Sequence, residues 1–348
     1  MPTLEFKALA EKLKNRFIHG EVTSLEPRGD YDCFIRSSSD TIRIARVLCI
    51  FLMCYVHTRI GNLNPLIESL IADVLGRSSV PLLSVISGLL MVGYFRQTFS
   101  RAIGLRFKSL IIPMIFWGVS GSIIRYIAGD IDEIVINDII PISAPGNFAH
   151  LAFLRDLFLL MVATPFLILA LKKTSYTVLL LIAVGLVMPP SPILLRPEIL
   201  SFYAVGLFLG LYKIPDLRSL DAIILVIFIL TTIGVVFWNW KGEVFNDLIL
   251  RPICAWAFWI IALFISATPW RSVFIKVEPV IFLLFLSHPL VGLFVRGVYG
   301  KAQLNIDTAF WLVIPLICLA VAFLGKRILA ISLMPKIVPL CVVGKQNR

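Results

Sequence analysis

The chain has 348 residues, of which 59% are hydrophobic and 15% are charged, and its mean hydropathy is +0.92. A soluble domain carries about 25% charged residues, so this composition excludes one globular core and predicts an all-α polytopic membrane protein. The net charge of +11 is read first as a topology signal, because Lys and Arg gather on the cytoplasmic side of membrane proteins.

Residues 1–40 are polar and basic, without the apolar stretch and cleavage site of a signal peptide. They are predicted to form a cytoplasmic N-terminal leader. Leu4, Leu9, Leu13 and Phe17 fall near one helical face among lysines, so an interfacial amphipathic helix and a solvated leader are both open readings.

The rest of the chain alternates apolar runs with polar breaks, and a run of about 20 residues is needed to cross a membrane. We expect about ten transmembrane helices, within a single domain over residues 41–326 and followed by a cytoplasmic tail over 327–348. The predicted spans are 42–61, 79–95, 108–127, 150–171, 175–189, 198–212, 220–239, 250–268, 279–296 and 307–326. The spans at 175–189 and 198–212 are short and flank a proline-rich segment, so this pair is a candidate for a re-entrant or broken segment.

An even number of spans places both termini on one side, and most of the 32 Lys and Arg then fall on that side or beside it. The long loop at 129–147 on the other side carries acids and no base. Both termini are therefore predicted to be cytoplasmic.

The first predicted span contains two basic side chains at an informative spacing. Arg46 and His57 are eleven residues apart, which amounts to about three helical turns plus about 20°, so both project from nearly the same face, about 16 Å apart along the axis. A cation at the cytoplasmic end suits a phosphorylated ligand, and a neutral imidazole further in suits a general base. An acyl-CoA has this layout of phosphates, arm and thioester. The alternative, an interfacial Arg46 and a His57 that only forms a hydrogen bond, stays open on spacing alone.

Later spans carry further polar residues that are costly inside a membrane. Arg106 and Lys108 begin the third span, where they can reach a cofactor, whereas Arg96 and Arg101 in the loop before it are read as topology signals. The remaining candidates for a shared substrate cavity are His150, Arg155 and Asp156 at the start of the fourth span, and Ser287 and His288 in the ninth.

Several other functions lack support in the sequence. The six cysteines form no CxxC pair and no Cys/His spacing of a metal site, so no metal is expected. There is no GxSxG, P-loop or GxGxxG motif, and no basic surface interleaved with aromatics, so a nucleic-acid partner is not expected.

The chain resembles the integral-membrane acyltransferase-3 family over about residues 41–325. The family's most diagnostic feature is a basic residue, ten intervening residues and a histidine in the first helix, which Arg46 and His57 match. Five other segments are similar to family elements in the same order. These are VPLLSVISGLLM through Pro81, Ser87 and Gly88, RFKSLIIPMIFW through Arg106, Pro113 and Trp117, HLAFLRDLF with the helix of Phe202, Gly206 and Gly210 after it, and LFLSHPLV.

Two positions depart from the family pattern. Ser109 stands where the family has a second arginine, with Lys108 beside it as a substitute, which leaves the coenzyme A contacts open. Ala152 stands where the family has a tryptophan, which is consistent with a different acceptor.

The resemblance implies a bacterial inner-membrane O-acyltransferase, with acetyl as the expected group. It implies that acetyl-CoA or another acyl-CoA enters from the cytoplasm with its phosphates near Arg46, Arg106 and Lys108, and that His57 acts as general base or transient acyl carrier. The acceptor would be a hydroxyl of a surface polysaccharide, lipid-linked glycan or oligosaccharide, and membrane lipids are the other expected partner. The alternative function is a transporter or flippase of a carbohydrate or lipid, which also fits ten helices with buried charges.

Overall fold

The apolar runs of the sequence fold into helices in the computed structural model, which describes residues 38–59, 63–94, 99–143, 148–212, 218–238, 249–302 and 307–331. Every regular element among these residues is helical. The α-helices are α3 (Ser39–His57), α4 (Pro65–Glu68), α5 (Ser79–Tyr94), α6 (Phe99–Arg106), α7 (Ile112–Ile127), α8 (Ile136–Ile139), α9 (Ala149–Lys173), α10 (Thr177–Val187), α11 (Glu198–Leu211), α12 (Arg218–Trp238), α14 (Arg251–Ser266), α15 (Arg271–Lys301) and α16 (Thr308–Ile331), with shorter π or 3-10 segments at Ser69–Val74, Leu75–Ser78 and Phe107–Ile111. The leader up to residue 37, Arg96 and the tail beyond residue 331 lie outside the described residues.

Each of the ten predicted spans overlaps one of these helices. Within the described part of the chain, five helical stretches are long and apolar enough to cross a membrane: Pro65–Gly93, Phe99–Ile127, His150–Lys173, Arg271–Tyr299 and Thr308–Ile328. Together they indicate a multi-pass membrane protein, while the count of ten spans and the side of the termini stay predictions. Helices α10 and α11 have 11 and 14 residues, so at 1.5 Å per residue each falls short of a hydrocarbon core about 30 Å thick.

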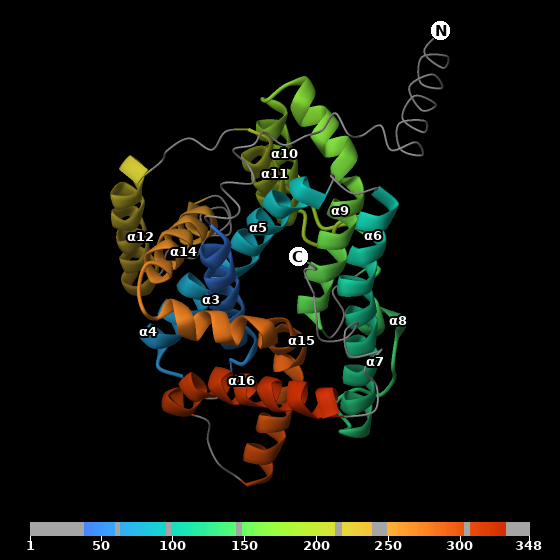
Figure 1. Ribbon diagram of the computed structural model, residues 1–348. Helices are drawn as coiled ribbons and strands as arrows, with labels where there is room; N and C mark the ends of the chain where they lie inside the picture. The colour runs from blue at the N-terminus through green and yellow to red at the C-terminus, as the bar shows by residue number, and fades with distance from the viewer. Residues whose placement is uncertain are drawn as a thin grey trace.

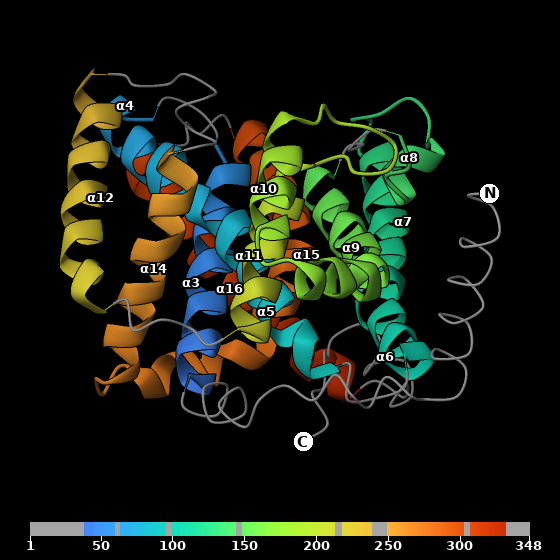
Figure 2. The same ribbon diagram turned by 90° about the horizontal axis from the view of Figure 1, so that it is seen from above.

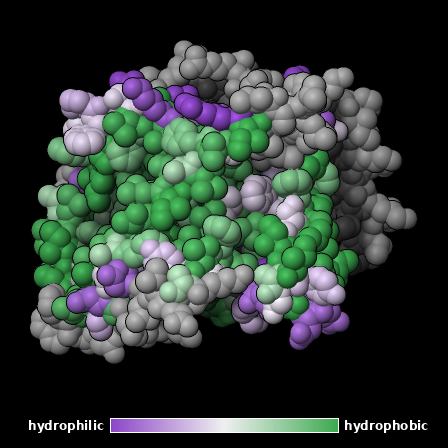
Figure 3. Space-filling view, turned by 90° about the horizontal axis from the view of Figure 1, so that it is seen from below, coloured by the Kyte–Doolittle hydropathy of each residue, from purple (hydrophilic) through white to green (hydrophobic). Residues whose placement is uncertain are grey.

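The surface agrees with a membrane environment. Figure 3 shows a broad apolar band between polar residues at the upper and lower edges of the molecule. Large apolar side chains point outward from several helices, including Phe166, Val187 and Phe264, each of them more than half exposed. A soluble protein would bury such residues, whereas lipid tails solvate them.

Helix α3 lies in the middle of the bundle, although it carries charged residues at its start. It packs against α15, α14, α5 and α16, and Figure 1 shows it between α14 and α15. Figure 2 shows α6 at the lower edge of the bundle and α4 and α8 at the upper edge, with α3 running between the two edges. Because α3 is central and spans the bundle, its two ends can serve two different sites.

Among the described helices, α5 and α11 have the most extensive contact, and they meet through glycines. A Cβ atom at Gly88 would collide with the backbone carbonyl of Tyr203, and one at Gly206 with that of Val85. The absence of side chains at these two positions lets the backbones approach, as in other membrane helix pairs with small residues at the interface.

Candidate functional site

Two cavities open along α3. The first, which we call the Arg46 cavity, has a volume of about 470 Å³ and is lined by Arg46, Arg106, Ser109, Glu278 and Lys326 among other residues. The second, the His57 cavity, has a volume of about 280 Å³ and is lined by His57, His150 and a group of arginines. The sequence therefore places its two key side chains on one helix, and the fold gives each of them its own cavity.

The Arg46 cavity is basic but not uniformly so. Arg46 donates from Nη1 to Oε1 of Glu278 on α15 at 3.0 Å, and both side chains are partly exposed. Arg106 and Lys326 add two further cations to the wall. A wall with three cations and a single acid suits a ligand with several negative charges, such as the phosphates of a nucleotide cofactor.

A π-helical turn shapes one side of this cavity. Residues Phe107–Ile111 form the π segment between α6 and α7, and Ser109 and Leu110 from it line the cavity together with Arg106 just before it. Such local widening of a helix is frequent at functional sites, since it turns side chains away from the regular helical positions.

The predicted cofactor residues are only partly brought together. Arg46 and Arg106 share the first cavity, whereas the side chain of Lys108 is exposed and is not part of the lining. Glu278 and Lys326, which sequence reasoning did not select, take part instead. Neither has a sequence signal of its own, because each stands at the end of a predicted span where charged residues are ordinary.

Three histidines from three helices gather beside the His57 cavity. The ring centroids of His57 and His150 are 6.0 Å apart, those of His57 and His288 are 5.3 Å apart, and those of His150 and His288 are 5.2 Å apart. His150 and His288 are buried, whereas His57 is partly exposed. Residues predicted separately from α3, α9 and α15 therefore form one cluster.

The hydrogen bonding of His288 fixes its protonation pattern. Its Nδ1 lies 2.8 Å from the backbone oxygen of Phe285, which can only accept, so Nδ1 carries the proton. In the neutral ring Nε2 is then an acceptor, and this atom is buried without a hydrogen-bond partner in the described part of the chain. The Nε2 atom of His150 is likewise buried and unpartnered among the described residues. Such atoms are rare in a folded interior and point to proton chemistry or an additional group.

Phe153 and Phe285, which we call the aromatic wall, lie where the two cavities approach each other. Phe153 lines both of them, while Phe285 lines the Arg46 cavity and packs edge-on against His150, with ring centroids 5.5 Å apart. The rings of Phe153 and Phe285 are themselves in contact at 6.3 Å. Phe153 therefore belongs to both linings, and Phe285 connects the Arg46 cavity with His150 of the other.

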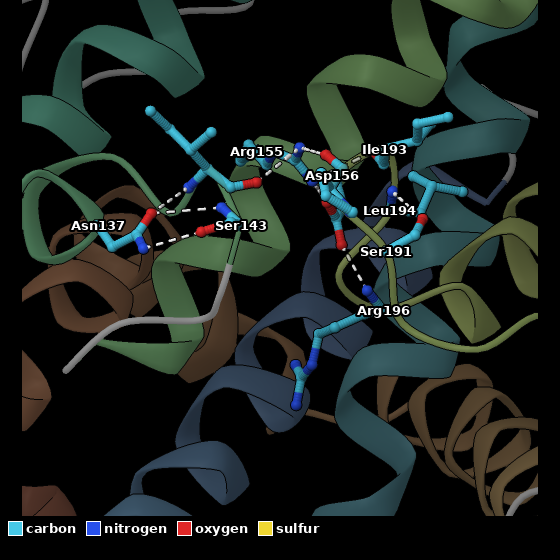
Figure 4. Close-up of polar contacts among 10 residues, drawn as sticks. Asn137, Ser143, Arg155, Asp156, Ser191, Ile193, Leu194 and Arg196 are labelled. Carbon is cyan, nitrogen blue, oxygen red and sulfur yellow. Dashed lines mark hydrogen bonds and ion pairs between the residues drawn. The ribbon is translucent and has the colours of Figure 1, made fainter.

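Arg155 and Asp156 lie in a different setting from the histidines. Figure 4 shows them joining α9 to the segment between α10 and α11. Arg155 bonds Asp156 at 2.6 Å and donates to the backbone oxygens of Pro192 and Ile193. Asp156 is fully buried and accepts the backbone N–H of Arg196 at 2.8 Å. Neither side chain lines the Arg46 cavity or the His57 cavity. Their observed contacts anchor this segment, and direct contact with substrate stays a prediction.

Ser287 also lies outside both cavity walls. Its hydroxyl is buried and has no hydrogen-bond partner among the described residues. It precedes His288 in α15, so its predicted contact with substrate remains a prediction. Among the described residues, no group of three or more His, Cys, Asp and Glu is arranged to hold a metal ion.

Arg59, at the end of α3, had no predicted role. It bonds Asp73 at 2.6 Å and lies 3.7 Å from Glu68, and it lines the His57 cavity. Arg77, Arg196 and Arg251 line the same cavity and were not selected from the sequence. Their positions lie in separate segments, so only the tertiary fold reveals the grouping.

Comparison with known proteins gives one family match. The family model described as an acyltransferase domain matches residues 40–325, a range that contains Arg46 and all three clustered histidines. No match was found among curated proteins or among solved structures.

Proposed function

This chain belongs to the acyltransferase-3 family, and from that premise we propose that it moves an acyl group from acyl-CoA to a hydroxyl of a carbohydrate. Acetyl is the expected group, with acetyl-CoA as donor. The acceptor is a surface polysaccharide, a lipid-linked glycan or an oligosaccharide, and the enzyme works in the bacterial inner membrane.

The observation that carries the proposal is the placement of Arg46 and His57 on one helix but in two cavities that share Phe153. Eleven residues of α-helix separate them by about 16 Å along the axis, comparable to the reach of the pantetheine arm. Phosphates held by Arg46 and Arg106 would therefore bring the thioester to the aromatic wall, beside the histidine cluster. Lys326 is an additional cation for the phosphates, and Lys108, in the π segment, is a further candidate.

The chemistry follows from the histidines. His57 takes the proton from the acceptor hydroxyl as its oxygen attacks the thioester carbonyl, and the tetrahedral intermediate collapses with cleavage of the C–S bond. The proton then passes to the departing thiolate, so that the products are the ester and coenzyme A. His288, neutral with an accepting Nε2, suits the role of holding a His57 N–H in place. In a two-step variant His57 itself carries the acyl group before the acceptor takes it.

The proposal is tested by incubating the purified full-length protein with labelled acetyl-CoA and a glycan extract. Covalent label on the glycan supports the transferase. Transmembrane movement of an unmodified glycan would support the transporter alternative and overturn the proposal.

The same assay tests the role of His57. Positioned general bases contribute about 10²–10⁴-fold, so His57→Ala and His57→Gln should both lower kcat by that range. Cys49→Ala is the matched control, since Cys49 is buried on the same helix and lines neither cavity. Wild-type transfer by either His57 variant, with the thermal unfolding of both unchanged, would rule out His57 as the base.

A further inference from the structure

The wall of the His57 cavity carries more arginine than acid. Arg59, Arg77, Arg196 and Arg251 line it, and Glu198 is the one acidic residue in that lining. A small cavity of this kind beside a catalytic histidine attracts negative charge, because its low-dielectric walls strengthen the field of the arginines.

Arg59 and Arg251 have acidic partners in the structure. Arg59 bonds Asp73 at 2.6 Å, and Arg251 bonds Glu198 at 3.3 Å. The acid on the cavity wall is therefore already engaged with a neighbouring arginine.

Arg196 differs from them. Its guanidinium makes no hydrogen bond and no ion pair within the residues that the structure describes, and the residue is partly buried. Its backbone N–H is bonded to Asp156, whose carboxylate is also held by Arg155, so that acid faces the main chain of Arg196. Figure 4 shows the Arg196 side chain directed away from this network, toward the helices below it. Backbone contacts thus hold the segment before α11 in place, and the guanidinium of Arg196 faces the His57 cavity without a partner among the described residues.

Burying a guanidinium without a partner is unfavourable unless a bound anion compensates its charge. The planar guanidinium can donate two parallel hydrogen bonds to a carboxylate or a phosphate. We propose that the His57 cavity binds an oxyanion, a carboxylate or a phosphate carried by the sugar acceptor, with Arg196 as its main contact. The inference rests on the proposed function, in that it places the acceptor beside His57.

This binding mode narrows the acceptor class. A volume of about 280 Å³ is near the lower end of ligand pockets, which span roughly 300–1,000 Å³, so the cavity holds about one sugar unit with its charged group. The acceptor is then an acidic sugar residue or a sugar phosphate. Fixing the anion at Arg196 presents a hydroxyl of the same unit to His57, which lines the same cavity.

The test uses the purified full-length chain in detergent and three matched probes: glucuronic acid, glucose 1-phosphate and glucose. Binding is measured by titration calorimetry and by the shift in thermal unfolding. We expect at least one of the two charged sugars to bind at least tenfold more tightly than glucose, and the comparison of the two separates a carboxylate from a phosphate.

Variants assign that binding to one side chain. Arg196→Gln should lower the affinity for the charged sugar at least tenfold. Arg196→Lys should retain part of that affinity, because lysine keeps the positive charge. Arg125→Gln is the matched control, since Arg125 pairs with Asp130 outside both cavities. Equal binding of all three sugars, failure of all three to bind, or full affinity in Arg196→Gln would overturn the inference.

Acetyl-CoA is titrated in parallel to keep the two proposals apart. Unchanged acetyl-CoA binding in Arg196→Gln is expected, because the phosphates of the donor lie in the Arg46 cavity. Weaker acetyl-CoA binding in that variant would make the His57 cavity a donor site and overturn the inference. If the wild type bound a charged sugar through Arg196 but never transferred an acyl group, the proposed function would fail while the anion site remained.

Discussion

The guanidinium of Arg46 is held by Glu278 across two helices, and this pairing sets what the arginine can do. An incoming phosphate has to share Arg46 with the carboxylate, which restrains the side chain toward the cavity without neutralising the other cations of the wall. Removing the arginine alone would leave Glu278 as an unpaired negative charge in the Arg46 cavity, where it would repel the phosphates of the proposed donor.

We expect Arg46→Ala to raise the KM for acyl-CoA about 10–100-fold with a much smaller change in kcat, since a hydrogen bond to a charged group contributes about 1.5–3 kcal/mol. The double variant Arg46→Ala/Glu278→Gln should recover part of this loss, because the repelling carboxylate is gone. Steady-state kinetics with varied acyl-CoA checks both. An unchanged KM in the single variant would remove Arg46 from the donor site.

The positions of the helices could be predicted well from the sequence, whereas the residues at which their charged ends begin could not. The prediction for α15 begins at residue 279 because Lys276 and Glu278 interrupt the apolar run, yet the helix begins at Arg271. Likewise, the helical stretch before α5 runs from Pro65 through Glu68 and Asp73, outside the predicted span. In both places the acids pair with arginines of α3 or the residues just after it, and hydropathy cannot anticipate such pairing.

The contact between α5 and α11 gives a prediction about stability. Gly206→Ala places a Cβ against the backbone carbonyl of Val85, so the two helices have to move apart, and overpacking of this kind destabilises by about 1–3 kcal/mol. Gly104→Ala in α6 is the matched control, because a Cβ there has no neighbour within 4 Å. Thermal unfolding should show a lower Tm for Gly206→Ala only, and equal Tm values for the two variants would contradict the close packing.

At the scale of the whole molecule, the site combines helix α3, which the spacing of Arg46 and His57 identifies, with residues of other segments that the spacing does not identify. Arg46 and His57 were found because they stand on one predicted helix. His150 and His288 were found because histidines are rare in apolar runs. Glu278, Lys326 and Arg196 were missed because their importance depends on which distant segment lies opposite each of them, and one sequence does not contain that information.

The aromatic wall gives a prediction at the same scale. Phe153→Ala should join the two cavities and admit water to the thioester, so acyl-CoA hydrolysis without acceptor should rise relative to transfer. Phe166→Ala on the same helix is the control, since its side chain is 59% exposed and lines neither cavity. Release of free coenzyme A in the absence of glycan is the measurement, and an unchanged rate in Phe153→Ala would show that the ring does not exclude water.

Helices α3 and α15 touch at two matching points, Arg46 with Glu278 and His57 with His288. Arg46 and His57 are eleven residues apart on α3, and their partners Glu278 and His288 are ten residues apart on α15. The two helices therefore run parallel, in the same direction, between these two contacts. One residue inserted in α15 between Glu278 and His288 would rotate His288 by about 100° away from His57, while the contact between Glu278 and Arg46 would stay in place. The spacing of Arg46 and His57 on α3 is thus matched by that of Glu278 and His288 on α15, so a change in the distance between the two cavities would require both helices to change together.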